Sequence, residues 1–193
     1  MARAKLNPLR FSLALSVLLA VLVPFGSLAQ PPDPLPIRMW GSFGSGSGQF
    51  NEPQDIDVDD KGNVFVVDRG NHRVQKFDTN GNFVVSFGGF GTGNGQFNQP
   101  TGVTLHPNGN VYVVDSGNDR VQAFTLGGVY LFEWGDTGTG DGQFRTPWGV
   151  GIDSNGNVYV SDTVNNRIQK FSETGDFLLA WGTPGQETGE LQF

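Results

Sequence analysis

The chain has 193 residues, with 12 Lys and Arg against 19 Asp and Glu, and a formal net charge of -7 at pH 7. This acidic balance argues against a nucleic-acid partner, which would require a basic patch or stripe. The chain has no cysteine, which excludes disulfides and thiol-linked lipids. Glycine contributes 29 residues and aromatic residues 12%. That combination favours a turn-rich folded domain over a disordered chain.

Residues 1–29 have the pattern of a secretory signal peptide. Three basic residues precede an apolar run over 11–23, and small residues stand at Ser27 and Ala29. This run of 13 residues is shorter than the roughly 20 that span a bilayer. We therefore expect cleavage after Ala29, a secreted or periplasmic location, no stable membrane insertion, and a linker over 30–34. Loss of three positive charges would take the formal charge from -7 to -10.

A repeat of 47 residues organises the rest of the chain. The tripeptide Gly-Gln-Phe begins at Gly48, Gly95 and Gly142, and prolines, aspartates, arginines and glycines recur in the same register. Each repeat holds four short strand-like runs separated by turn residues, which in the second repeat are 103–105, 111–114, 121–124 and 129–134. Four short strands per repeat are typical of a β-propeller blade.

The predicted fold is therefore all-β, with four-stranded antiparallel blades at about 49–87, 96–134 and 143–181 and the start of a next repeat at 182–193. Residues 35–41 match the fourth strand of a blade and predict a lone outer strand before the first repeat. Three blades are too few to close a propeller, which has about 4 to 8. We expect an incomplete ring, and favour a fragment of a longer propeller over a homodimer, with self-association through exposed blade edges.

Three motifs recur in the repeats: G-x-G-Q-F-x-x-P, then G-N-V-[FY]-V-x-D, then N-x-R-[VI]-Q. In these motifs residues 35–193 resemble the NHL repeat family. The resemblance implies a propeller, commonly six-bladed, that serves as an interaction platform.

A carboxylate and an arginine recur five residues apart in every repeat. A catalytic site is normally singular, so we interpret these residues as structural: the aspartate satisfies turn backbone groups and the arginine pairs with a carboxylate between strands. The residues are Asp68, Arg73, Asp115, Arg120, Asp162 and Arg167.

Binding residues are expected where the repeats differ on one end of the propeller. In a four-strand meander, the loops between blades and the loops between second and third strands emerge at the same end. Trp148 is the expected stacking platform for a ligand ring. The candidates are Gln54, Asp55, Arg69, His72, Thr101, Asp119, Arg145, Trp148 and Asn166.

Asp55 and Asp57 are candidates for a cation site. They alternate on one strand of the first repeat, where the other repeats have no carboxylate, and the first strand of a blade lines the central channel. Oxygen ligands suit calcium or another divalent cation. The alternative is a solvated acidic channel wall. His72 and His106 fall on opposite loop faces, which argues against a shared zinc site.

The leading interpretation is a binding or scaffolding module outside the cytoplasm, without catalysis, that contacts protein, peptide or glycan. The alternative is a fragment of a metal-dependent propeller enzyme. The family resemblance extends to peptidyl-hydroxyglycine amidating lyases, which typically have a metal-bound histidine after the loop proline. Here those positions hold Gln54, Thr101 and Trp148. A lactonase-like reading depends on Asp55 and Asp57 alone.

Overall fold

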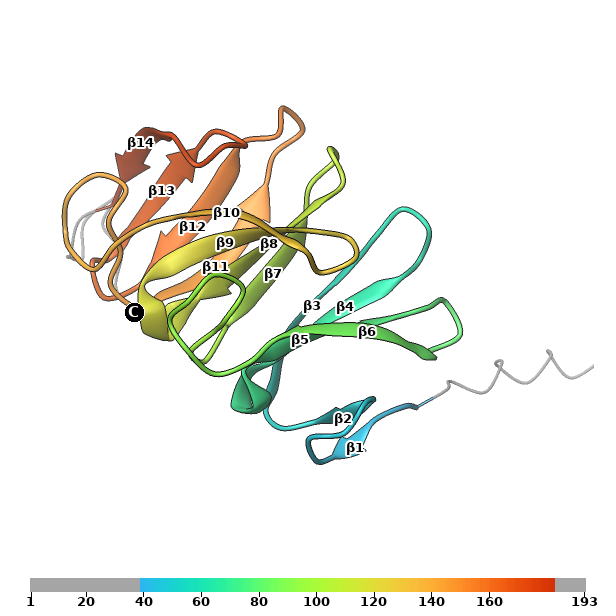
Figure 1. Cartoon of the computed structure of the whole chain (residues 1–193). Coiled ribbons are helices and arrows are strands. Elements are labelled where there is room, and N and C mark those ends of the chain that lie inside the picture. The colour runs from blue at the N-terminus through green and yellow to red at the C-terminus, as the bar shows by residue number, and fades with distance from the viewer. Residues whose placement is uncertain (1–38, 183–193) are drawn as a thin grey trace, which may run out of the picture. The chain divides into compact units, whose positions relative to one another are not determined.

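The computed structural model describes residues 39–182, so the predicted signal peptide, the linker and residues 183–193 lie outside the described residues. The described part is all-β and contains three four-stranded antiparallel sheets in a row, which confirms the predicted fold class (Figure 1). In this part of the chain, no helix is long and apolar enough to cross a membrane.

The three blades have the same strand order as the sequence. The first blade contains β3 (Pro53–Val58), β4 (Val64–Asp68), β5 (Arg73–Phe77) and β6 (Phe83–Gly88). The second contains β7 (Gly102–Leu105), β8 (Asn110–Asp115), β9 (Arg120–Thr125) and β10 (Tyr130–Trp134). The third contains β11 (Pro147–Ile152), β12 (Val158–Asp162), β13 (Arg167–Phe171) and β14 (Phe177–Trp181). Short 3-10 turns, η1 (Arg69–Asn71) and η2 (Ser116–Asn118), link the middle strands of the first two blades.

The first strands of neighbouring blades lie against one another, as expected for the strand that lines a propeller channel (Figure 1). Two apolar clusters fill the junctions between blades. Phe65 and Val67 of the first blade pack with Val111 and Phe124 of the second. On its other face, the second blade packs against the third. The middle blade is consequently buried on both sides, which explains why β8 is apolar on both faces.

Of the predicted lone outer strand over 35–41, residues 35–38 lie outside the described residues. Residues 39–41 have no strand structure. The chain instead forms a parallel two-stranded sheet from β1 (Ser42–Phe43) and β2 (Gln49–Phe50), and the later loops repeat this pairing as single bridges. The segment is therefore the loop that precedes a blade. Residues 39–41 have no strand partner among the described residues.

Trp40 nevertheless takes the place of the aromatic residue that ends a fourth strand. Its ring lies 3.1 Å from the position of a Cβ built on Gly81. The rings of Phe87 and Trp134 make the corresponding contacts with turn glycines of the second and third blades. The described residues thus hold three blades and the edge of a fourth repeat, and the six-bladed ring implied by the family resemblance is not formed within them.

A buried carboxylate organises one end of each blade. In the second blade, Asp115 is fully buried and accepts hydrogen bonds from Asn98 N at 2.7 Å, Arg120 Nε at 2.8 Å and Gln122 Nε2 at 3.1 Å. Arg120 also donates to the carbonyl oxygen of Gln96 at 2.9 Å. The first and third blades repeat this cluster around Asp68 and Asp162.

Each cluster joins the loop before a blade to the turn between its second and third strands. These two segments therefore share one end of the propeller, here called the loop face, which lies on the lower side of Figure 1. It comprises residues 41–52, 69–72, 89–99, 116–119, 136–146 and 163–166. The opposite end, the turn face, comprises the turns at 59–62, 78–81, 106–109, 125–128, 153–156 and 172–175.

We predict that Asp115→Ala lowers the free energy of unfolding by about 3–5 kcal/mol, because it removes the fully buried carboxylate that pairs with Arg120 and leaves the guanidinium with the partly exposed Glu133 as its remaining carboxylate. Urea unfolding followed by circular dichroism measures the change. Asp141→Ala, at an exposed loop position, is the control and should shift stability by at most about 0.5 kcal/mol. Equal effects of the two substitutions would contradict the framework role of the cluster.

Candidate functional site

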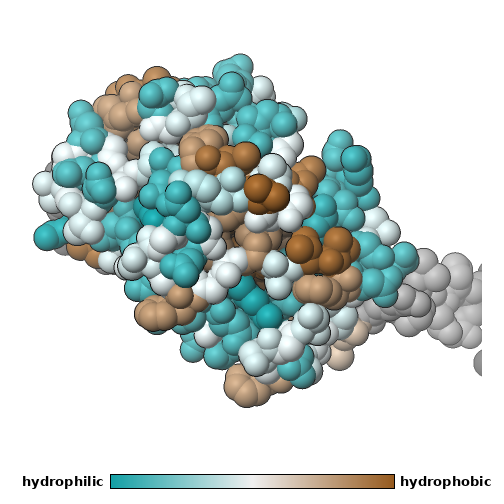
Figure 2. All heavy atoms as spheres, in the orientation of Figure 1, coloured by the Kyte–Doolittle hydropathy of each residue, from teal (hydrophilic) through white to brown (hydrophobic). Residues whose placement is uncertain are grey.

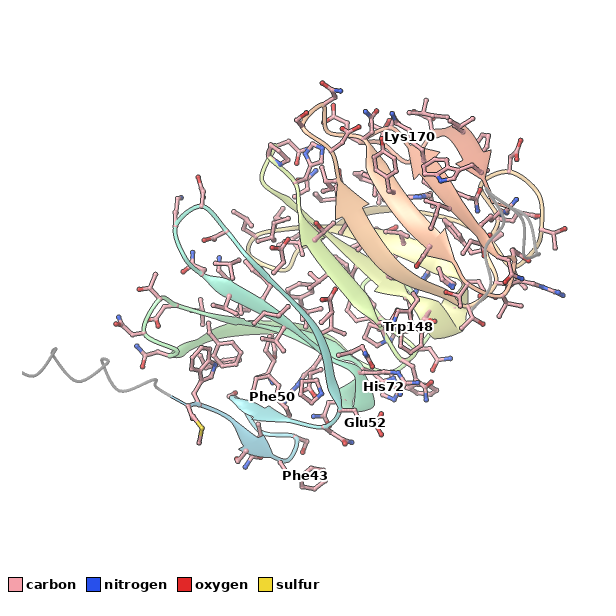
Figure 3. All side chains as sticks on the ribbon, turned by 180° about the vertical axis from the view of Figure 1, so that it is seen from behind. Phe43, Phe50, Glu52, His72, Trp148 and Lys170 are labelled. Carbon is pink, nitrogen blue, oxygen red and sulfur yellow. The ribbon has the colours of Figure 1, made fainter. Side chains whose placement is uncertain are left out.

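Three aromatic side chains stand exposed on or beside the loop face. Phe43 is 84% exposed, Phe90 71% and Trp148 43%. In Figure 3, Phe43 and Trp148 lie along the same lower side of the molecule as Glu52 and His72. Phe90 joins this surface because its ring meets the His72 ring edge-on, with centroids 5.0 Å apart. Exposed aromatic rings beside polar groups are typical of surfaces that bind ligands.

The nine binding candidates from the sequence divide into two groups. Gln54, Arg145 and Trp148 are exposed, and Asn166 is half-buried. The other five candidates hold hydrogen bonds between or within blades, and only part of each faces solvent. They are Asp55, Arg69, His72, Thr101 and Asp119.

On the loop face, Arg69 and His72 join the first blade to the loop before the second blade by hydrogen bonds. The Arg69 guanidinium donates one hydrogen bond to the Glu52 carboxylate and another to the side-chain oxygen of Gln99, each at 2.8 Å. His72 Nδ1 accepts a hydrogen bond from Gln99 N at 2.9 Å. Because a backbone amide can only donate, this bond identifies Nδ1 as an unprotonated acceptor. These residues vary between repeats because each junction is fastened differently.

The second junction uses other residues at equivalent positions. Asp119 takes the place of His72 and accepts a hydrogen bond from Thr146 N at 2.7 Å. Thr101, only 2% exposed, donates to the carbonyl oxygen of Trp148 at 2.7 Å. Thr101 is therefore a junction residue and is inaccessible to a ligand. Its hydrogen bond also fixes the backbone that carries the Trp148 ring.

Asp55 and Asp57 link the first two blades by hydrogen bonds. Asp55 accepts hydrogen bonds from Ile56 N and Val103 N, each at 2.9 Å. Asp57 accepts from Val58 N at 2.7 Å and Leu105 N at 2.8 Å. Backbone amides thus already occupy all four carboxylate oxygens. Within residues 39–182, no group of three or more side chains is placed to hold a metal ion. The geometry favours a structural role over the predicted cation site.

We predict that Asp57→Ala lowers the free energy of unfolding by about 1–2 kcal/mol, because the amide of Leu105 loses its acceptor. Asp60→Ala, at an exposed position in the turn that follows the same strand, is the control and should change the free energy of unfolding little. Calcium and EDTA should both leave the thermal midpoint of the wild type unchanged. A calcium-dependent rise that disappears in Asp57→Ala would restore the cation role.

Two carboxylates of the turn face, Asp153 and Asp59, have lowered pKa values. Hydrogen bonds from Asn157, first from its side-chain amide, hold the pKa of Asp153 far below its usual range. At Asp59, burial acts to raise the pKa, but hydrogen bonds from the side chain and backbone of Asn63 outweigh it, and the pKa is lowered. Both carboxylates remain ionised at neutral pH and act as permanent acceptors within their turns.

This depression predicts how stability depends on pH. A group whose pKa is lower in the folded state stabilises the fold above its unfolded value, about 3.9 for aspartate, and loses this contribution as pH falls through the folded value. Asp153→Asn should therefore lower the urea midpoint at pH 7 more than at pH 3. Urea unfolding of both proteins at the two pH values checks this. A difference that widens in acid would contradict the assignment.

Sequence reasoning missed Phe43 and Phe90. They occupy the same position in successive loops, and the third loop has Thr137 there. An aromatic residue directly before a loop glycine, outside the predicted strand-like runs, is a signal that could have identified both. The junction residues were harder to recognise, because variation between repeats looks the same whether it serves a ligand or a neighbouring blade.

Comparison with known proteins identifies the repeat. The family model of the NHL repeat matches residues 50–77, 97–124 and 144–171. The chain is 51% identical over 49 residues to Protein lin-41 of Caenorhabditis elegans and 42% identical over 48 residues to Protein brain tumor of Drosophila melanogaster. Each match covers 25% of this chain, but only 4% and 5% of those proteins.

Solved propeller structures share the fold. Virginiamycin B lyase from Staphylococcus aureus matches with a TM-score of 0.54 and 18% identity, over 71% of this chain and 43% of the lyase. A gluconolactonase from Xanthomonas campestris matches with a TM-score of 0.55 and 19% identity, over 73% of this chain and 50% of that enzyme. The chain thus spans half or less of these enzymes, and at this level of identity the likeness concerns the fold alone.

Proposed function

Because the chain belongs to the NHL repeat family, we propose that it is an extracytoplasmic binding or scaffolding module whose loop face binds protein, peptide or glycan. The observation that carries this proposal is the set of exposed rings, Phe43, Phe90 and Trp148, on an otherwise firmly hydrogen-bonded end of the propeller. Large aromatic side chains supply much of the binding energy at interfaces.

The framework beneath these rings supports the proposal. Arg145 follows the third loop and its backbone amide donates to the buried Asp162 at 2.8 Å, which leaves the guanidinium exposed beside the segment that carries Trp148. Because the backbone beneath the ring and the cation is already fixed, only side chains need to be ordered when a ligand binds. Gln54 adds an amide that can donate and accept.

Export is part of the proposal. The basic and apolar pattern of residues 1–29 supports a signal peptide, and a chain without cysteine can fold in an oxidising compartment without forming disulfides. The partner would then be a molecule outside the cytoplasm.

We propose no catalytic role for the described residues. The positions after the loop prolines hold Gln54, Thr101 and Trp148, and Thr101 is buried in a blade junction. Asp55 and Asp57, on which a lactonase-like site would depend, already accept backbone amides. The enzymes that share the fold therefore lend no residue-level support to catalysis at these positions.

Self-association is a further part of the proposal. Ile56 and Val58 are 57% and 51% exposed on the first blade, and Leu179 and Trp181 are 55% and 43% exposed on the third. In the middle blade, the equivalent positions are largely covered by its neighbours. Both end faces of the row thus offer apolar surface to another blade.

We predict that Trp148→Ala weakens ligand binding at least about 30-fold while leaving stability unchanged, because a central ring at an interface contributes about 2 kcal/mol or more. The full chain is screened on glycan and peptide arrays, and the affinity of each hit is then measured for both proteins. Leu131→Ala, at an exposed position on the outer strand β10, is the matched control. No hit, or hits equally weakened by both substitutions, would contradict a loop-face site.

A further inference from the structure

The two blade junctions differ sharply on the turn face, the end opposite the proposed binding surface. Three side chains of the second blade clasp the third. His106 Nε2 lies 2.9 Å from the carbonyl oxygen of Gly156, and the Tyr112 hydroxyl donates to that of Glu173 at 2.8 Å. Asn108 donates to the Glu173 carboxylate at 3.1 Å. The clasp closes this junction.

The equivalent residues of the first blade make no such clasp. Asp59 stands at the position of His106, and its carboxylate accepts the amides of Lys61 and Asn63 within its own turn. Phe65 replaces Tyr112 and has no hydroxyl. Lys76 makes the one turn-face hydrogen bond found here between the described residues of the two blades, to the carbonyl oxygen of Leu126 at 3.2 Å.

A groove remains where the clasp is missing. A Cβ built on Gly156 would lie 2.8 Å from His106 Nε2, so the imidazole ring fills the space beside that glycine. A Cβ built on the equivalent Gly109 meets nothing within 4 Å. The groove has a volume of about 560 Å³, and Figure 2 shows the surface hollowed between the β3–β4 turn and the β7–β8 turn.

The lining of the groove indicates what it accepts. Val58, Leu105 and Leu126 supply apolar surface, while Asp59, Asp60 and Lys61 line one wall. Hydrogen bonds outweigh burial at Asp59 and lower its pKa, so this carboxylate stays ionised at neutral pH. The ring of His106 shows which group fits beside the equivalent glycine: a flat five-membered ring that donates an N–H to its carbonyl oxygen.

We propose that this groove binds a histidine side chain presented by a polypeptide partner, with the ring donating an N–H to the carbonyl oxygen of Gly109. The partner's imidazole takes the place that His106 fills at the other junction. A ring of five atoms fills only a small part of the groove. Apolar residues beside the partner's histidine occupy the rest, against Val58 and Leu105.

The test uses the full chain labelled with ¹⁵N and a blocked Leu-His-Leu peptide at pH 8, where the imidazole is neutral. We expect saturable NMR shifts of the Lys61 and Asn108 amides, with an affinity higher than that for free imidazole. A peptide with thiazolylalanine in place of histidine keeps a five-membered ring without an N–H donor and should bind at least tenfold more weakly.

Two variants at open turn glycines separate the groove from general effects. Gly109→Asn places a side chain in the groove at a φ of +88°, which asparagine tolerates, and should weaken binding at least tenfold. Gly142→Asn makes the same change at a φ of +76°, in open space on the loop face, and should leave binding intact.

The proposal is overturned if the histidine peptide produces no saturable shifts, if the thiazole peptide binds equally well, or if Gly109→Asn has no effect. If free imidazole bound as tightly as the peptide, the proposal of a polypeptide partner would be overturned, because the apolar surface of Val58 and Leu105 would then add nothing to the affinity. Since the site lies on the turn face, these outcomes are independent of binding at the loop face.

Discussion

The buried carboxylate at the end of each second strand is the interaction on which the rest of the structure depends. Asp115, which is fully buried, gathers a loop amide, an arginine and a glutamine into one cluster. A carboxylate in this position is stable only because every oxygen has donors. Through these hydrogen bonds, Asp115 holds the loop before the blade against the turn between the second and third strands.

The fold could be predicted from the sequence because its signals are periodic. The runs predicted at 111–114 and 121–124 fall within β8 (Asn110–Asp115) and β9 (Arg120–Thr125). Gly109, with a φ of +88°, marks the hairpin turn between β7 and β8. Residues 39–41, the described part of the predicted strand over 35–41, have no strand structure, because a repeat pattern gives the position of a residue within a blade but not the presence of a neighbouring strand.

The candidate site was less predictable. Variation between repeats identified Trp148 and Arg145, which are exposed, but equally Thr101 and His72, which fasten blades. Those residues differ from repeat to repeat because one junction pairs an imidazole with an amide and the next pairs a carboxylate with an amide. Sequence alone cannot distinguish a side chain that varies for a ligand from one that varies for the adjoining blade.

Several junction hydrogen bonds join a side chain of one blade to the backbone of the next, whereas the Arg69–Gln99 and Asn108–Glu173 pairs join two side chains. In the first group, Thr101 and Tyr112 donate to carbonyl oxygens of the following blade, and Asp57 accepts one of its amides. Within this group one blade contributes a side chain and the other contributes only backbone, which every amino acid except proline provides in full. At these contacts, the blade that contributes only backbone should tolerate substitutions better than the blade that contributes the side chain. One repeat can therefore change in sequence there without a matching change in its neighbour.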